Sequence, residues 1–380
     1  MRKVITGNYA VSYGVRDSRV SVIAAYPITP QTQIVELLSE FVANGELDAE
    51  FIKVESEHSA MAACIGASIT GVRTFTATSS QGLALMHEML HWAVGARTPV
   101  VIANVNRAMG PPWSIWTEQN DSLAQKETGL LQFYCSSNQE VYDTIIQSFK
   151  VSEEVQLPAM IVLDAFILSH TYEPVDIISI SHVDEFLPPY NPRYTLDTED
   201  PHAFGGLGTP EIYMELRYNI HEDHLKALEL IRRYGREFGE MFSRTYDVFE
   251  EYRCEDAEIL IVMAGSAAST AKDAVDVMRE RGLKIGLLRM RVLRPFPKDD
   301  LRKVSNNKNL IVVIDRNISF GNEGIFFTEV KSCLYGSGVP IQGYVAGLGG
   351  RDILTEDIVK MTEEALQTKQ VDFKWWGVKL

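Results

Sequence analysis

Residues 1–170 alternate short apolar runs with segments whose apolar residues recur at helical spacing. The apolar runs predict strands over Val20–Tyr26, Phe51–Val54, Arg73–Ala77, Val100–Val105, Leu130–Tyr134 and Met160–Leu163. The helical spacing predicts helices near residues 8–16, 30–43, 57–70, 82–96 and 138–154. This alternation predicts an α/β fold with a parallel sheet, in which a site lies beyond the carboxyl ends of the strands.

The alternation stops between His170 and Tyr252. Proline, glycine and aspartate concentrate in "LPPYNPRYTLDTEDPHAFGGLGTPE", which predicts an extended connection, and a charged helical stretch follows from His221. Residues 256–370 return to the first pattern, with strands expected near 258–264, 284–290, 309–315 and 339–345. We therefore divide the chain into a first α/β domain (1–170), a connection (171–252) and a second α/β domain (253–380).

Composition agrees with a globular chain of two or three domains, at roughly 100–200 residues for each. The 380 residues are 46% hydrophobic and 23% charged, with a net charge of −15. No Lys- or Arg-rich stripe suggests nucleic acid. Nor does any segment offer the ~20 consecutive apolar residues of a membrane span. The N-terminus is too polar for a secretory signal.

The four cysteines, Cys64, Cys135, Cys254 and Cys333, are far apart in the sequence and form no C-x-x-C pair. This spacing argues against a disulfide framework, a zinc knuckle or an iron–sulfur cluster held by this chain alone. We expect reduced, buried thiols in a cytoplasmic protein.

The stretch "AYPITPQ", Ala25 to Gln31, follows the first long apolar run. An amphipathic helix pattern comes next, which predicts Thr29 at the N-cap and Pro30 at the first helical position. A capped helix explains these residues without any function. Alternatively, the Thr29 hydroxyl faces the crevice at the strand ends, where an anion could bind.

In "VESEHSAMAACIGAS", a predicted strand ends before Ser56, which can cap a helix that opens with Glu57. The small residues of this helix predict that another segment packs closely against it. Glu57 is either an acid favoured by the helix dipole or a carboxylate that hydrogen-bonds a cofactor nitrogen in a partly buried cleft.

His87, Glu88 and His91 match the H-E-x-x-H signature of zinc proteases. Apolar residues surround the motif, the third histidine of the metzincin pattern is absent, and we expect a chance match on a buried helix. The preceding "TSSQG" turn, residues 78–82, is the better site candidate. Arg107 ends another apolar strand before a loop with Trp113 and Trp116, where it could capture a carboxylate or pair with an acid of the protein.

Four stretches in this order, "YPITP", "VESEHSA", "TATSSQGL" and "NVNRA", resemble the α subunit of 2-oxoacid:ferredoxin oxidoreductases, and most of all the pyruvate:ferredoxin oxidoreductases. The resemblance covers nearly the whole chain. It implies a thiamine-diphosphate-binding domain of the pyrimidine type, followed by a domain like the C-terminal domain of transketolase.

The resemblance assigns roles to individual residues. Glu57 matches the glutamate that hydrogen-bonds N1′ of the aminopyrimidine ring, and Thr29 matches the threonine near the reacting carbonyl. Arg107 matches the arginine that pairs with the 2-oxoacid carboxylate. The turn Ser80-Gln81-Gly82 is expected to border the cofactor, as are Pro27 and Ile28.

The implied reaction is the reversible, coenzyme A- and thiamine-diphosphate-dependent oxidative decarboxylation of a 2-oxoacid to acyl-CoA and CO₂, with reduction of ferredoxin. Pyruvate is the expected substrate. The G-D-G motif that binds Mg²⁺ and diphosphate is absent. We therefore expect no metal site in this chain. The resemblance instead implies a β subunit with the diphosphate/Mg²⁺ site and [4Fe–4S] clusters, and ferredoxin-like γ and possibly δ subunits.

Three alternatives remain open at this point. The substrate could be 2-oxoisovalerate, 2-oxoglutarate or an aryl oxoacid. The chain could also be a zinc protease, or a scaffold that only supports a partner; the scaffold predicts loss of the acid at Glu57, which is present.

Overall fold

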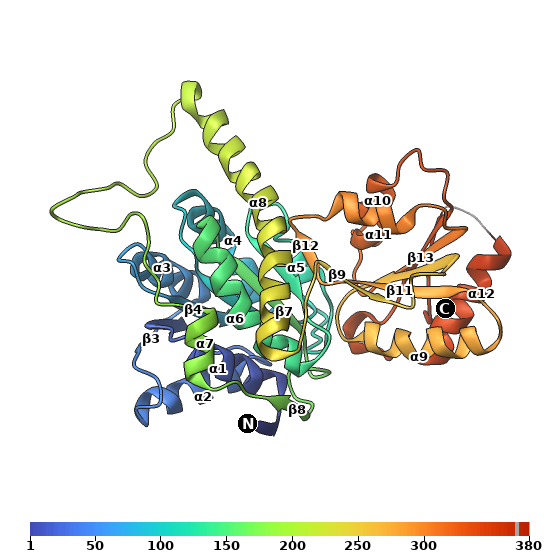
Figure 1. Ribbon diagram of the computed structural model, residues 1–380, viewed down its shortest axis with the longest axis horizontal. Helices are drawn as coiled ribbons and strands as arrows, with labels where there is room; N and C mark the ends of the chain where they lie inside the picture. Colours follow the sequence, from blue (N-terminus) through green and yellow to red (C-terminus); the bar gives the residue numbers. More distant parts are fainter. Residues whose placement is uncertain (369–371, 380) are drawn as a thin grey trace.

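A computed structural model describes residues 1–368 and 372–379 and contains two α/β units (Figure 1). The first unit contains a seven-stranded sheet with the strand order β12-β6-β7-β5-β4-β2-β3, which is parallel except for its edge strand β12. Its strands are β2 (Val22–Ala25), β3 (Glu50–Lys53), β4 (Thr74–Thr78), β5 (Val101–Asn106), β6 (Leu131–Tyr134), β7 (Ala159–Asp164) and β12 (Val292–Arg294). The six strands predicted in residues 1–170 are confirmed, with small shifts at their ends.

Helices cover this sheet, and two short strands from distant parts of the chain pair separately from it. The helices are α1 (Gly7–Asp17), α2 (Thr32–Ala43), α3 (Glu57–Ser68), α4 (Gln81–Gly95), α5 (Asn120–Leu123) and α6 (Asn138–Val155). Helix α3 packs against α4, and α1 packs against both α2 and α6. Strands β1 (Arg2–Ile5) and β8 (Glu173–Asp176) pair antiparallel in a separate small sheet, which the sequence pattern did not predict.

The connection between the units contains helix α7 (Ile180–Phe186), an extended loop, and the 33-residue helix α8 (Pro210–Phe242). Helix α8 begins at Pro210, eleven positions before the predicted start. Proline is favourable at a first helical position, and the Thr209 carbonyl accepts the N–H groups of Ile212 and Tyr213. The first turns of α8 and the loop before it project away from the body of the protein (Figure 1). The later turns pack against α6.

The second unit is built on a six-stranded sheet with the order β15-β14-β13-β10-β11-β9. Its strands are β9 (Phe249–Tyr252), β10 (Ile259–Met263), β11 (Ile285–Met290), β13 (Leu310–Asp315), β14 (Ile341–Val345) and β15 (Phe373–Trp375). Its helices are α9 (Ala267–Glu280), α10 (Lys298–Ser305), α11 (Ile325–Cys333), the short η1 (Leu348–Gly350) and α12 (Thr355–Thr368). The four strands predicted after residue 256 are confirmed, and β9 adds an antiparallel edge.

One strand crosses between the two units. Strand β12 follows β11 in the chain but pairs with β6 of the first sheet. Beside this crossing, Glu140 receives hydrogen bonds from Arg289 at 3.0 Å and Arg291 at 3.1 Å, and all three side chains are buried. Each of these charges thus has a partner of opposite sign, and the cluster joins α6 of the first unit to residues 289–291 of the second.

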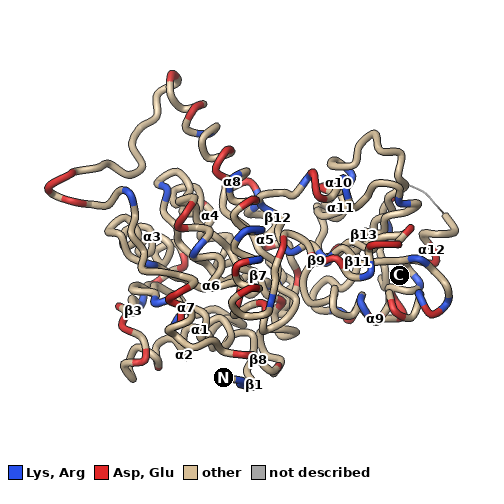
Figure 2. The backbone as a smooth tube through the Cα atoms, viewed as in Figure 1, with Lys and Arg blue, Asp and Glu red and all other residues tan. Residues whose placement is uncertain are grey.

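The surface and thiols follow the sequence expectations. Figure 2 shows both signs of charge interspersed along the chain, with acidic residues at the outer bend of the loop before α8. All four cysteines are unpaired and buried. No helix in the described ranges is both long and apolar enough to cross a membrane.

Candidate functional site

The candidate residues gather at the carboxyl ends of three neighbouring parallel strands. Strand β4 lies between β2 and β5 in the sheet, so the segments that follow these strands meet at one edge. The YPITP segment follows β2, the Ser80 turn follows β4, and Arg107 follows β5. Glu57 joins them from the first turn of α3, which packs against α4.

The YPITP segment differs from its predicted conformation. Residues 29–31 form a turn in which the Gln31 N–H donates to the Ile28 carbonyl at 2.9 Å, so α2 begins only at Thr32. The prediction that Thr29 caps this helix is therefore wrong. Thr29 is exposed, and its carbonyl oxygen accepts a 2.6 Å hydrogen bond from Arg107 Nη1. This bond joins the segment after β2 to the segment after β5.

The Ser80 turn is tightly held. Ser80 has a φ of 53°, which is uncommon for a residue with a side chain, between strand β4 and helix α4. Its hydroxyl donates to the Ala108 carbonyl at 2.7 Å and also contacts the Gln81 side-chain oxygen. Gln81 in turn accepts a 3.3 Å bond from Arg107 Nη2, so this turn and Arg107 form one network.

Glu57 lies against the start of α4. Ser56 caps α3 as predicted, and its hydroxyl accepts the Ser59 N–H at 3.2 Å. Glu57 is only 6% exposed. A methyl group at Gly82 would lie 2.4 Å from Glu57 Oε1 and 2.6 Å from Thr78 Oγ1, so only glycine leaves room for both oxygens. The Thr78 hydroxyl is buried and has no hydrogen-bond partner among the described residues.

Arg107 is a buried cation, and among the described residues its guanidinium forms no ion pair with a carboxylate. Its side chain hydrogen-bonds the neutral oxygens of Thr29 and Gln81, and it lies over the Trp113 ring at 5.5 Å from the centroid. The residue is 3% exposed, and Nε has no partner within the described part of the chain. Burial lowers the pKa of Arg107. The guanidinium thus retains capacity for an anionic ligand.

Asp121 is a residue of this site that sequence reasoning missed. It is fully buried in the four-residue helix α5. Its Oδ2 accepts hydrogen bonds from Ser80 N at 2.9 Å, from Asn104 Nδ2 at 3.1 Å and from Arg107 N at 3.1 Å. Burial raises the pKa of Asp121 to about 6, while these donors favour its charged form. The carboxylate therefore ties the turn after β4 to the turn after β5.

The H-E-x-x-H segment is not a metal site. His87 Nδ1 contacts Gln125 Oε1 at 2.6 Å, and the described residues contain no group of three or more His, Cys, Asp or Glu side chains that could hold a metal ion. The zinc protease alternative is therefore wrong. The expectation of a buried helix is also wrong for one face of α4, because Leu85 and Trp92 are each 51% exposed.

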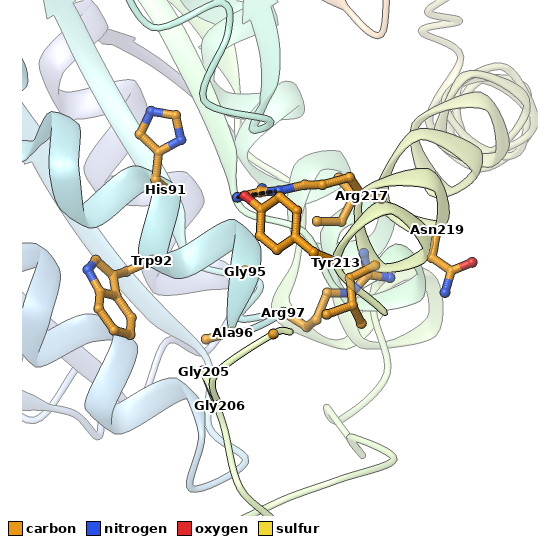
Figure 3. A pocket seen from close by; sticks show the side chains of 13 residues that line it. His91, Trp92, Gly95, Ala96, Arg97, Gly205, Gly206, Tyr213, Arg217 and Asn219 are labelled. Carbon is orange, nitrogen blue, oxygen red and sulfur yellow. Dashed lines mark hydrogen bonds between the residues drawn. The ribbon is translucent and has the colours of Figure 1, made fainter. Parts of the chain in front are cut away.

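A separate cavity of about 460 Å³ lies between the last turn of α4 and the first turns of α8. Figure 3 shows Trp92 and Gly95 on one side, and Tyr213 with its hydrogen bonds from Arg217 on the other. None of the candidate residues Glu57, Thr29 and Arg107 lines this cavity. It is therefore distinct from the candidate site.

The candidate site fits the aminopyrimidine half of thiamine diphosphate in its donor and acceptor chemistry. The Glu57 carboxylate and the Thr78 hydroxyl both lie against Gly82, and Arg107 lies at the next strand end.

Comparisons with known proteins agree with this site. Residues 13–236 match the family model "pyruvate flavodoxin/ferredoxin oxidoreductase, thiamine diP-bdg", and residues 257–358 match "pyruvate:ferredoxin oxidoreductase core domain II". The chain is 53% identical to ketoisovalerate oxidoreductase subunit VorA of Pyrococcus horikoshii, over 100% of this chain and 98% of that protein. It is 48% identical to pyruvate synthase subunit PorA of Methanothermobacter thermautotrophicus, over 99% of this chain and 98% of that protein.

Solved structures give the same fold. The 2-oxoglutarate:ferredoxin oxidoreductase of Magnetococcus marinus superposes with a TM-score of 0.75 at 19% identity, over 96% of this chain and 65% of that longer chain. A split-gene transketolase superposes with a TM-score of 0.58 at 13% identity, over 97% of this chain and 100% of that one. The expected α/β fold with a thiamine-diphosphate-binding first domain is confirmed. With two family models and near-full-length identity to such subunits, the chain belongs to the 2-oxoacid:ferredoxin oxidoreductases, as an α-type subunit.

Proposed function

We propose that this chain supplies the pyrimidine-binding and oxoacid-binding half of the active site in a 2-oxoacid:ferredoxin oxidoreductase complex. The observation that carries the proposal is the buried Glu57 carboxylate, held against Gly82 beside the unpartnered Thr78 hydroxyl. A buried carboxylate beside a buried hydroxyl that lacks a partner among the described residues suits a ligand that offers a ring nitrogen.

Thiamine diphosphate, when bound, supplies the carbon nucleophile and the electron sink for decarboxylation. In our proposal, Glu57 exchanges a hydrogen bond and a proton with the ring nitrogen N1′. Its low exposure strengthens that interaction, because little water competes for the carboxylate. In this proposal Ser80, Gln81 and Gly82 border the cofactor from the turn after β4, and Pro27 and Ile28 border it from the segment after β2. Gly82 also lies against the Glu57 carboxylate.

Arg107 binds the carboxylate of the 2-oxoacid in this proposal. Its guanidinium is already oriented by the Thr29 carbonyl and by Gln81, so little conformational freedom is lost when the anion arrives. Trp113 lies along one side of the guanidinium, with its ring centroid at 5.5 Å. Thr29, whose carbonyl is bonded to Arg107, lies beside the bound oxoacid.

The substrate is a 2-oxoacid, with pyruvate and 2-oxoisovalerate as the two candidates. Relatives named for ketoisovalerate oxidoreductase are 51–53% identical to this chain, and relatives named for pyruvate synthase are 45–48% identical. A panel of oxoacids separates the two. Pyruvate, 2-oxoisovalerate, 2-oxoglutarate and an aryl oxoacid should be compared by coenzyme A-dependent reduction of methyl viologen.

Partner subunits complete the site in our proposal. The absence of a G-D-G motif and of clustered cysteines in the sequence supports a β subunit that brings the diphosphate/Mg²⁺ site and the [4Fe–4S] clusters, with γ and possibly δ subunits of the ferredoxin type. The complex passes its electrons to ferredoxin in the cytoplasm. The chain alone should bind thiamine diphosphate weakly, and tight binding in isothermal titration calorimetry would contradict a shared site.

Turnover of the assembled complex tests the role of Glu57. Glu57→Gln should lower the rate by about 10²–10⁴-fold, as expected for loss of a general acid–base group. The control is Glu55→Gln, since Glu55 is exposed two positions earlier. Normal turnover by an assembled Glu57→Gln complex, or no oxoacid-dependent reduction by the wild type, would refute the proposal.

A further inference from the structure

The second sheet has a topological switch point that is filled by the first unit. Strand β10 lies between β11 and β13, so the chain leaves it to one side and returns on the other. Ligands of such sheets bind in the crevice outside the carboxyl ends of the two central strands. Here, that crevice lies between the segments that follow β10 and β13, residues 264–266 and 316–318.

A carboxylate of the first unit occupies the position that an anionic ligand would take at the start of α9. Asp164, at the end of β7, accepts the Ser266 backbone N–H at 2.8 Å and also the Ser266 hydroxyl. Gly265 has a φ of +76°, and a methyl group on it would lie 2.9 Å from Asp164 Oδ2. The favourable N-terminal end of α9 is therefore used for contact between the units.

The segment that follows Arg107 fills the rest of the crevice. The Gln119 N–H donates to the Arg316 carbonyl at 3.0 Å. Asn120 forms two hydrogen bonds with the backbone of Ile318, donating to its carbonyl at 2.8 Å and accepting its N–H at 3.0 Å. One backbone pair and the Asn120 side-chain amide thus join the two units here.

The glycine-rich turn after β14 holds the middle of the same segment. Gly350 donates its N–H to the Thr117 carbonyl at 2.9 Å. Its φ is +79°, and a methyl group on it would lie 2.4 Å from Trp116 Cβ. Trp116 in turn accepts the Ala108 N–H at 3.1 Å through its carbonyl oxygen. Gly350 is therefore linked through Trp116 to the residue next to Arg107.

We propose that the second α/β unit is a positioning clamp for residues 107–120, the oxoacid-binding loop, with Gly350 and Ser266 as its positioning residues. Ser266 acts on this loop through Asp164, whose Oδ1 also accepts the Thr117 hydroxyl at 3.3 Å. The inference rests on the proposed function, since it assigns the second unit a part in binding the oxoacid through Arg107. The crevice that serves ligands in other doubly wound sheets here holds this loop, and the position of Arg107 depends on both units.

A pair of glycine variants in the assembled complex tests the clamp. Gly350→Ala introduces left-handed strain and the clash with Trp116, whereas Gly336→Ala introduces the same strain at a φ of +82° with no atom within 4 Å. We expect Gly350→Ala to raise the oxoacid KM by between about tenfold and a hundredfold, the cost of a small misplacement, with kcat and the thiamine diphosphate affinity nearly unchanged. Gly336→Ala should leave the KM at the wild-type value.

A double variant shows whether the effect passes through Arg107. In an Arg107→Ala background, adding Gly350→Ala should change the KM no further, because the group that the clamp positions is gone. Equal KM values for Gly350→Ala and Gly336→Ala, or an undiminished Gly350→Ala effect without Arg107, would overturn the clamp. If Gly350→Ala does not assemble, Ser266→Ala must raise the KM instead, and an unchanged KM in that variant overturns the clamp.

The outcomes separate the two proposals. The proposed function is contradicted if none of the oxoacids supports viologen reduction by the wild-type complex. If the wild-type complex is active but Gly350→Ala and Ser266→Ala both keep the wild-type oxoacid KM, only the clamp is contradicted.

Discussion

Gly82 provides a sharp test of how the Glu57 carboxylate is held. In Gly82→Ala, the added Cβ would lie 2.4 Å from Glu57 Oε1, 2.8 Å from Glu57 Cδ and 2.6 Å from Thr78 Oγ1. All three distances are far below an ordinary contact, so the glutamate side chain must move. The helix itself tolerates the change, since alanine is the better helix former by about 1 kcal/mol.

The expected effect is large on catalysis and small on stability. Turning a buried side chain to an unfavourable rotamer costs about 0.5–1.5 kcal/mol, which the gain in helix propensity approximately offsets. A catalytic group displaced by about 1 Å can lower the rate by about 10²-fold. Gly82→Ala should therefore reduce kcat/KM by about 10²-fold while the midpoint of thermal unfolding changes by only a few degrees.

The assay is coenzyme A-dependent viologen reduction by the assembled complex, with differential scanning calorimetry of the same preparation. Gly95→Ala is the matched control, because Gly95 is in the same helix and has no atom within 4 Å of an added Cβ. A Gly82→Ala complex with wild-type kcat/KM would refute the reasoning. So would an equal loss of activity in both variants.

Three further predictions follow from single side chains. Arg107→Ala should raise the oxoacid KM by about 10- to 150-fold, the value of one charge-assisted contact of ~1.5–3 kcal/mol, and steady-state kinetics with an unchanged KM would exclude it as the anion-binding group. Glu140→Ala should lower the free energy of unfolding by about 3–5 kcal/mol in urea titrations, because Arg289 and Arg291 lose their shared buried partner; a loss under about 1 kcal/mol would contradict that structural role. The oxoacid KM should rise as the pH falls through about 6, where Asp121 protonates and can no longer accept all of its N–H donors. The effect of Asp121 on the free energy of unfolding runs the other way. Its pKa in the folded protein is raised from 3.8, so its protonation stabilises the folded state as the pH falls. Urea titrations that attribute a loss of stability below pH 6 to Asp121 would contradict this assignment.

Much of the fold was predictable because its signals are local. The buried strands appear in the sequence as apolar runs, and the Ser56 cap depends on residues only three positions apart. Strand β12 was not predictable in this way. It is only three residues long, and its partner β6 lies about 160 positions earlier in the chain. The projecting turns of α8 were also missed, since nearly every residue there is exposed and apolar periodicity gives no guide.

The site shows the same division. Glu57 and Arg107 could be proposed from the sequence because each follows a predicted strand, in a stretch that resembles the family. The start of α2 was misplaced because Gln31 turns its amide to the carbonyls of Tyr26 and Ala77, the second of which is distant in the sequence. Asp121 was missed for a related reason, since its partners Ser80 and Asn104 lie 41 and 17 positions away.

We propose that the Glu57 carboxylate acts on the pyrimidine ring, in a cofactor site that two subunits share. The most direct measurement is the rate at which the thiazolium C2 hydrogen exchanges with deuterium in the assembled complex, followed by rapid quench and NMR. We expect Glu57→Gln to slow this exchange by at least about 10²-fold at full cofactor occupancy, with Glu55→Gln equal to the wild type. Exchange in Glu57→Gln at the wild-type rate would contradict the account.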